Sequence, residues 1–315
     1  MRAIQVSRFG GPEVLVPAEV PAPVAGPGQL LIEVDAAGVN YADTHRTDGT
    51  STTAVELPFI PGSEVIGRTR DGRRVLAHTF KGGGYAELAV VAADDAVDVP
   101  GRVGDAEALA LLVQGLTAWH LLRSSARLSR GESVVVNAAA GGVGSLALQL
   151  ARLFGAGRVI AVASTEEKRK LAVSLGADIA VASDPDGYTA RVVAANNNRP
   201  VDVVLESTGG ATFGAALGAL AGFGRLVTYG NAAHQGRPLV DPAVLAERNL
   251  AVAGFWLQPA LEAPGAFREP LAELFDLVAT GKLEPVVAEY PLTEAGRAHE
   301  ELRARRTTGK LVLRP

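Results

Sequence analysis

The sequence predicts an α/β protein with two parts, a β-rich part and a doubly wound parallel sheet. From about residue 130, short apolar segments alternate with amphipathic ones, which is typical of parallel strands covered by helices on both faces. Before about residue 110, turn signals recur about every 8–12 residues, the spacing expected of a compact barrel or sandwich. The length of 315 residues favours two domains, and a hydrophobic content of 48% supports a large buried interior.

The β-rich part is expected to contain strands at 30–34, 74–77 and 86–91, separated by turns rich in Pro and Gly. In the second part, apolar strands are predicted at 133–137, 158–163, 179–182, 201–206, 225–229 and 250–255, with helices at 142–154, 165–175 and 211–220. The tail, about 257–315, does not continue this alternation. It predicts helices at 270–280 and near 294–303 and strands at 286–290 and 310–313, and we expect it to pack back on the first part.

The composition excludes several kinds of chemistry. The sequence has no cysteine, so it can form no disulfide, no thiolate nucleophile and no Cys-ligated zinc site. The opening residues do not resemble a signal peptide, and the most apolar stretch, 106–122, is interrupted by polar residues and falls short of the roughly 20 apolar residues of a membrane span. The net charge is −4. We therefore expect a cytoplasmic protein without a membrane or nucleic-acid partner.

A glycine-rich loop is the strongest local motif. It reads Ala139-x-Gly141-x-x-Gly144, follows a buried strand and opens a helix. This is the context in which such a loop binds a dinucleotide, because the glycines let the backbone approach a pyrophosphate and the helix start offers free N–H groups. The alternative is an ordinary strand–helix turn made of small residues.

The end of the second strand predicts which dinucleotide is bound. A carboxylate about 20 residues after the loop would hold the ribose 2′-hydroxyl of NAD. This chain has Ser164 there, followed by Lys168, which can bind a 2′-phosphate. We therefore expect NADP(H). Ser164 and Glu167 also match a helix capping box, and Lys168 could belong to a solvated helix face.

Motifs along nearly the whole chain match one family. They are FGGPEV from Phe9, AAGVNYAD from Ala36, PFIPGSE from Pro58, GLTA from Gly115, AAAGGVG from Ala138, YGN from Tyr229 and GKLVL from Gly309. The chain resembles the zinc-free quinone oxidoreductase (zeta-crystallin-like) branch of the medium-chain dehydrogenase/reductase superfamily. The resemblance implies a GroES-like catalytic domain at 1–112 and 257–315, a Rossmann NADP-binding domain at 113–256, and a homodimer that pairs through the last Rossmann strand.

The resemblance also implies a set of cofactor contacts. Matched position by position, they are Asn40, Thr117, Ala140, Gly141, Gly142, Val143, Ser164, Lys168, Tyr229, Gly230, Asn231, Phe255, Trp256 and Lys310. For some of these another reading stays open. Tyr229, Phe255 and Trp256 could be core residues, and Lys310 could simply cap the final strand. Two positions depart from the family pattern, where it has tyrosines and this chain has Ser183 and His45.

The metal ligands of zinc-dependent relatives are not retained. Those relatives carry Cys where this chain has Asn40 and His where it has Ser63, and only Glu64 matches. Because zinc needs three or four well-placed ligands, we expect no metal. A substrate that accepts hydride without a Lewis acid is then required, and quinones and α,β-unsaturated carbonyls meet that requirement.

Three side chains are the candidate catalytic residues. Asn40 is expected to hydrogen-bond the substrate oxygen or the cofactor. His45 is the first candidate for proton donor, because its ordinary pKa lies near neutrality. Tyr41 and Asp43 are alternatives, and solvent is a further one. The predicted function is an NADPH-dependent quinone oxidoreductase. The alternatives are a 2-alkenal or enone reductase, or a non-catalytic NADPH-binding protein.

Overall fold

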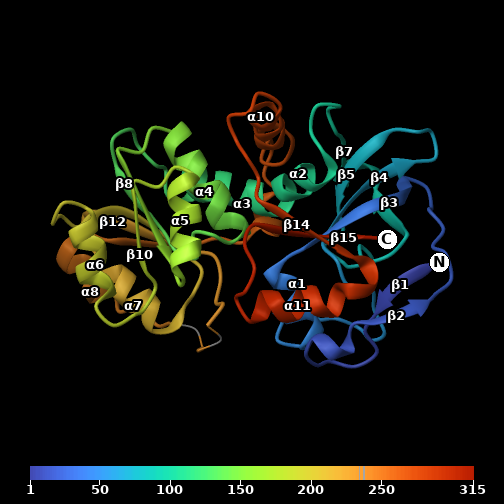
Figure 1. Cartoon of the computed structure of the whole chain (residues 1–315), viewed down its shortest axis with the longest axis horizontal. Helices are drawn as coiled ribbons and strands as arrows, with labels where there is room; N and C mark the ends of the chain where they lie inside the picture. Colours follow the sequence, from blue (N-terminus) through green and yellow to red (C-terminus); the bar gives the residue numbers. More distant parts are fainter. Residues whose placement is uncertain (234, 237) are drawn as a thin grey trace. The chain divides into compact units, whose positions relative to one another are not determined.

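The computed structural model describes residues 1–233, 235–236 and 238–315 and divides the chain into two compact units (Figure 1). Unit 1 comprises Met1–Gln114 and Phe267–Pro315, and unit 2 comprises Gly115–Ala266. The division between residues 114 and 115 lies close to the expected domain boundary after residue 112. The second division lies after residue 266, whereas the expected one lies after residue 256. Residues 257–266 therefore belong to unit 2. There His120 Nε2 lies 2.8 Å from the carbonyl oxygen of Ala266.

Unit 1 is built from both ends of the described chain. Its elements are β1 (Arg2–Gln5), β2 (Val16–Glu19), β3 (Gln29–Val39), α1 (Tyr41–Thr47), β4 (Glu64–Thr69), β5 (Arg74–His78), β6 (Leu88–Ala92), β7 (Ala96–Asp98), α2 (Asp105–Ala110), α10 (Arg268–Ala279), β14 (Val287–Pro291), α11 (Ala295–Arg303) and β15 (Lys310–Arg314). A seven-stranded sheet has the order β14-β15-β3-β4-β5-β7, with β6 also paired to β3, and β1 and β2 form a separate hairpin. The tail therefore packs back on the first part, as expected.

Strand β3 is the centre of the larger sheet. It is longer than the expected strand at 30–34, and its second half is almost entirely buried. Strand β15 pairs antiparallel with β3, with Leu311 opposite Val39, and β4 pairs antiparallel with its other edge. The first residues of β15 and β4 consequently lie on either side of the end of β3. This arrangement positions the site described below.

Unit 2 contains α3 (Leu116–His120), β8 (Ser133–Val136), α4 (Gly142–Leu153), β9 (Arg158–Ala163), α5 (Glu166–Ser174), β10 (Ile179–Ala182), α6 (Tyr188–Ala195), β11 (Val201–Glu206), α7 (Gly210–Gly218), β12 (Leu220–Thr228), α8 (Pro242–Arg248), β13 (Ala251–Gly254) and α9 (Leu257–Ala260). All six strands are parallel, in the order β10-β9-β8-β11-β12-β13. This is the doubly wound topology that the sequence predicts, with the direction of strand order reversing at β8 and β11.

The apolar composition of the strands explains this sheet. Val134, Val135 and Val136 of β8 are fully buried, as expected for a central strand covered by helices on both faces (Figure 1). The helices follow the strands along the chain and return it to the same edge each time. Therefore all six strands end at one edge, where the connecting loops gather. No helix in the described part of the chain has both the length and the apolar character needed to cross a membrane.

Candidate functional site

In unit 1, three strands bring Asn40, Glu64 and Lys310 together. Asn40 directly follows β3, Glu64 is the first residue of β4, and Lys310 is the first residue of β15. Since both neighbouring strands run antiparallel to β3, these residues meet at its end. The Glu64 and Lys310 side chains are fully buried, whereas Asn40 retains 4% exposure and Ser63 retains 7%. The ion pair is therefore the inner layer of the cluster, and Asn40 belongs to its outer layer.

The hydrogen bonds of this cluster are specific. Lys310 Nζ donates to Glu64 Oε1, to Asn40 Oδ1 at 3.0 Å and to the carbonyl oxygen of Val39 at 3.3 Å. Asn40 Nδ2 donates to Glu64 Oε1 at 2.7 Å, and the backbone N–H of Val113 donates to Glu64 Oε2 at 3.0 Å. Lys310, expected to contact the cofactor or to cap the last strand, is the first residue of that strand and is bonded to Asn40.

A second buried network supports the start of α1. The Asp43 carboxylate accepts from the backbone N–H of Asn40 at 2.8 Å, from Ser63 Oγ at 2.5 Å and from Tyr85 Oη at 3.2 Å. Tyr85 Oη also lies 3.0 Å from His299 Nε2. Burial raises the pKa of Asp43 and the pKa of Tyr85, and burial lowers the pKa of His299 to about 3. Asp43 therefore holds the backbone at Asn40, which leaves the Asn40 side chain to Glu64 and Lys310.

The other two candidate catalytic residues, Tyr41 and His45, lie on one face of α1. Their rings form an edge-to-face pair with centroids 5.6 Å apart, and His45 Nδ1 lies 2.8 Å from Thr50 Oγ1. Both side chains are half-buried. Burial raises the pKa of Tyr41, which keeps its hydroxyl protonated at neutral pH. These contacts leave both residues as candidates for proton transfer, with no role assigned by the geometry itself.

In unit 2, the glycine loop lies at the carboxyl edge of the sheet. It follows β8 and leads into α4, whose first residue is Gly142. A Cβ on Gly144 would stand 2.4 Å from the carbonyl oxygen of Ala138 and 2.8 Å from Ala139 Cα, so only glycine allows this close approach. Because the loop and the N-terminus of a 12-residue helix share this edge, free N–H groups are available for an anion.

The loop after β12 lies at the same edge and contains a buried acceptor. Asn231 Oδ1 is buried and has no hydrogen-bond partner in the part of the chain that the structure describes. Next to it, burial raises the pKa of Tyr229 to about 12. The backbone N–H of Tyr229 donates to the carbonyl oxygen of Glu206 at the end of β11. A buried acceptor without a partner is costly, so Asn231 Oδ1 is suited to a donor supplied by a ligand.

The end of β9 carries the residues expected to bind the 2′-phosphate. Ser164 is exposed and Lys168 is half-buried, one turn into α5. The N-cap of α5 is Thr165, whose Oγ1 accepts from the backbone N–H of Lys168 at 3.3 Å. The capping box that begins at Ser164 is therefore wrong, because the helix starts one residue later and leaves Ser164 outside it. Arg169, which no sequence pattern indicated, donates to the carbonyl oxygen of Ser164 at 3.2 Å.

The remaining expected contacts are spread over the same unit. Thr117 is buried in α3. Phe255 follows β13 and stacks on His120 with ring centroids 6.0 Å apart, while Trp256 is 55% exposed. Gly230, between Tyr229 and Asn231, is exposed. The packing of Phe255 on His120 agrees with the alternative that it is a structural residue, whereas the exposure of Trp256 does not suit a core residue.

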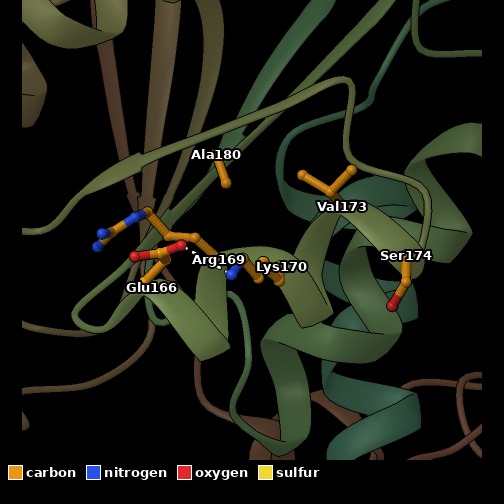
Figure 2. A pocket seen from close by; sticks show the side chains of 6 residues that line it. All are labelled: Glu166, Arg169, Lys170, Val173, Ser174 and Ala180. Carbon is orange, nitrogen blue, oxygen red and sulfur yellow. Dashed lines mark ion pairs between the residues drawn. The ribbon is translucent and has the colours of Figure 1, made fainter.

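A cavity of about 400 Å³ lies on unit 2 beside α5 and β10 (Figure 2). Its lining residues are Glu166, Arg169, Lys170, Val173, Ser174 and Ala180. Lys170 Nζ lies 2.7 Å from Glu166 Oε1, so the two charges at its rim are paired with each other. None of the expected cofactor contacts lines this cavity. It is therefore a surface hollow along α5, and it shares only Arg169 with the residues described at the end of β9.

The tight packing at Gly144 yields a stability prediction. We expect Gly144→Ala to lower the free energy of unfolding by about 1–3 kcal/mol, because the new methyl group would overlap backbone atoms of Ala138 and Ala139. Chemical denaturation measures this change. Gly214→Ala is the matched control, since a Cβ there meets no atom within 4 Å in the exposed middle of α7. It should be neutral or stabilising by up to about 1 kcal/mol. Equal effects of both substitutions would contradict the packing argument.

Comparisons with known proteins agree with this fold and arrangement. Residues 26–101 match the family model of the alcohol dehydrogenase GroES-like domain, and residues 142–276 match that of the zinc-binding dehydrogenases. A quinone oxidoreductase of Pseudomonas aeruginosa is 34% identical over 328 aligned residues, covering 100% of this chain and 99% of that protein. The two matched models thus define a two-domain dehydrogenase class.

Solved structures give the same result. The Escherichia coli quinone oxidoreductase complexed with NADPH has a TM-score of 0.93 at 31% identity and full coverage of both chains. The quinone oxidoreductase of Thermus thermophilus, also solved in complex with NADPH, has a TM-score of 0.87 at 38% identity and full coverage of both chains. This chain belongs to the quinone oxidoreductase branch of the medium-chain dehydrogenase/reductase superfamily. It is an oxidoreductase enzyme.

One family model is named for zinc, and the residues at the corresponding place do not suit that metal. Asn40 offers a neutral amide, the Ser63 hydroxyl donates to Asp43, and the Glu64 carboxylate is bound by the Lys310 ammonium group. Zinc sites in proteins use thiolate, imidazole and carboxylate ligands in sets of three or four. In the described part of the chain, no group of three or more His, Cys, Asp or Glu side chains is arranged to hold a metal ion.

Proposed function

We propose that this enzyme reduces quinones with NADPH and does so without zinc. The main support is its full-length similarity to proteins named quinone oxidoreductases, together with the cluster of Asn40, Glu64 and Lys310. In that cluster an internal ammonium group already neutralises the carboxylate. The polar group left at the outer layer is an amide, which donates a hydrogen bond and does not act as a Lewis acid.

The residues of unit 2 fit the cofactor NADP(H). The close approach at Gly144 brings the loop of Ala140, Gly141, Gly142 and Val143 to the start of α4, where backbone N–H groups can hold the pyrophosphate. Ser164 and Lys168 would hold the 2′-phosphate, and Asn231 Oδ1 would accept a hydrogen bond near the nicotinamide end. When bound, the cofactor supplies the hydride.

On the substrate side, Asn40 would donate an N–H to the oxygen that gains negative charge as hydride adds. An oriented donor stabilises that charge where it develops. One proton then completes the reduction of a quinone to a hydroquinone, and His45, Tyr41, Asp43 and solvent remain the candidate sources. A quinone spreads the charge over its ring and second oxygen, so one neutral donor is enough.

The experiment is NADPH oxidation by the purified enzyme with ortho- and para-quinones and linear 2-alkenals side by side, with and without a zinc chelator. We expect quinones to give the higher kcat/KM and the chelator to change nothing. Preference for linear enals would favour the enone reductase. Tight NADPH binding without turnover on either class would favour the non-catalytic alternative. Loss of activity with the chelator would contradict the zinc-free mechanism.

Lys168 is expected to set the choice between NADPH and NADH. We expect Lys168→Ala to lower the ratio of kcat/KM for NADPH to that for NADH by about tenfold or more, because a charged hydrogen bond contributes about 1.5–3 kcal/mol. Lys170→Ala is the matched control, since Lys170 already pairs with Glu166 on the exposed side of α5. It should leave the ratio within about twofold. Steady-state kinetics with both cofactors measure both variants. A ratio for Lys168→Ala equal to that of the wild type would remove Lys168 from the phosphate site.

We also propose that two copies pair through β13 in a cytoplasmic homodimer. The strand is the last in the order of the unit 2 sheet, and its ends, Ala251 and Gly254, are exposed. An exposed strand at the edge of a sheet has unpaired backbone groups that suit pairing with a second strand.

A further inference from the structure

We propose that Lys310 is a positioning residue, whose buried ammonium group fixes the Asn40 amide with one N–H directed toward the oxygen of the substrate. This inference deepens the proposed function and rests on the role of Asn40 in it. Lys310 itself touches neither substrate nor cofactor in this proposal. It acts through the orientation of a neighbouring side chain.

Lys310 uses all of its hydrogen-bond donors within the cluster. An ammonium group has three N–H donors. Lys310 Nζ has three acceptors, on Glu64, Asn40 and the Val39 backbone, and the side chain is fully buried. No donor is left for a ligand. A direct contact between Lys310 and the cofactor would therefore require one of these bonds to break.

The two ends of the Asn40 amide contact side chains of opposite charge. Its oxygen faces the ammonium group of Lys310, and the Gln114 Nε2 group lies 3.4 Å away on the same side. Its nitrogen faces the Glu64 carboxylate at 2.7 Å. A flipped amide would set oxygen against carboxylate and N–H against ammonium, which are both repulsive. The pair of charges thus selects one orientation, and the second N–H of Nδ2 remains as a donor.

A glycine beside the ion pair leaves room for both charged side chains. Gly38, near the end of β3, lies between the two charged side chains. A Cβ at this position would stand 2.5 Å from Glu64 Oε1 and 2.7 Å from Lys310 Cε. Taking two charges out of water is costly, and replacing a buried ion pair with neutral side chains is often neutral or stabilising. The ion pair is therefore better explained by its effect on the orientation of the Asn40 amide than by a contribution to the stability of the protein.

A double substitution tests this without leaving a buried charge. Lys310→Met combined with Glu64→Gln removes both charges and keeps similar volumes, so the protein should still fold, with Tm close to wild type. The Asn40 amide then loses the charges that select its orientation. We expect kcat for quinone reduction to fall about tenfold while the Kd for NADPH, measured by fluorescence titration, stays within about twofold.

The matched control is an ion pair elsewhere. Arg225→Met combined with Glu132→Gln removes a partly buried pair of unit 2, whose nitrogen and oxygen lie 2.6 Å apart. It should leave kcat unchanged. In a variant that already carries Asn40→Ala, the Lys310–Glu64 double substitution should lower kcat by less than about twofold, because a residue that acts through Asn40 has no effect once Asn40 is gone.

Three outcomes would overturn the inference. They are an unchanged kcat in the double variant, a weaker NADPH affinity with unchanged kcat, and a full tenfold loss that persists without the Asn40 side chain. A measurement that does not depend on turnover tests the role of Lys310 separately from the proposed function. NMR exchange of the Asn40 Nδ2 protons should be at least fivefold faster in the double variant. If the wild type reduces no quinone, the proposed function fails, and this exchange rate still decides whether Lys310 fixes the amide.

Discussion

Asn40→Ala should lower kcat for quinone reduction at least tenfold. The substitution removes the amide donor from the outer layer of the cluster and leaves the Glu64–Lys310 pair intact. Loss of one oriented donor to a developing oxyanion costs about 10²–10³ in kcat in hydrolases. A smaller loss is expected here because a quinone delocalises the charge. Steady-state kinetics at saturating NADPH measure the change.

The control for this substitution is Ser63→Ala. Ser63 has a similar exposed fraction, but its hydroxyl donates to Asp43 behind the cluster. We expect its effect on kcat to stay within about threefold. Wild-type kcat for Asn40→Ala would remove Asn40 from the reaction and would leave the family assignment untouched.

Because of His299, the free energy of unfolding should be about 2 kcal/mol lower at pH 5 than at pH 7. Burial lowers the pKa of His299 to about 3 in the folded protein, against an ordinary value of 6.5. Between these values the unfolded chain binds a proton that the folded protein does not bind. The stabilisation is therefore complete above about pH 6.5 and is lost as the pH falls toward 3. Urea unfolding at both pH values measures the difference.

His299→Gln is the variant that isolates this effect. Its amide can still hydrogen-bond the Tyr85 hydroxyl, which lies 3.0 Å from His299 Nε2, but it does not titrate. Asp43 contributes with the opposite sign, because its pKa is raised and its stabilisation is present at low pH. That contribution is common to both proteins and cancels in the comparison. An identical loss of stability in wild type and variant would contradict the assignment to His299.

The strands of unit 2 were predictable because most are short apolar runs, and three of them are followed by a helical period. The six expected strands correspond to the six observed ones, with boundaries shifted by a few residues. Unit 1 was harder. Strand β4 begins with Glu64, and α1 contains polar residues without an apolar period, so neither produced a recognisable pattern. Their structure depends on partners that are distant in the sequence.

The same distinction explains the site. The glycine loop, Ser164 and the segment from Tyr229 to Asn231 could be placed because each follows a strand whose end fixes its position. The pairing of Glu64 with Lys310 could not be predicted, because 246 residues separate them. The one available signal was the scarcity of lysine, which made each of the few lysines worth attention. Tyr85 and His299, 214 residues apart, gave no signal of this kind.

The discontinuity of unit 1 has a consequence for how the protein is made. Translation completes every residue of unit 2 before it supplies α10, α11, β14 and β15. Until β15 emerges, the last residues of β3 lack a neighbour on the edge that β3 shares with β6, and Glu64 lacks its cation. Since domains fold as units during synthesis, unit 2 is the first that can fold completely on the ribosome. Unit 1 is completed last, when β15 pairs with the end of β3.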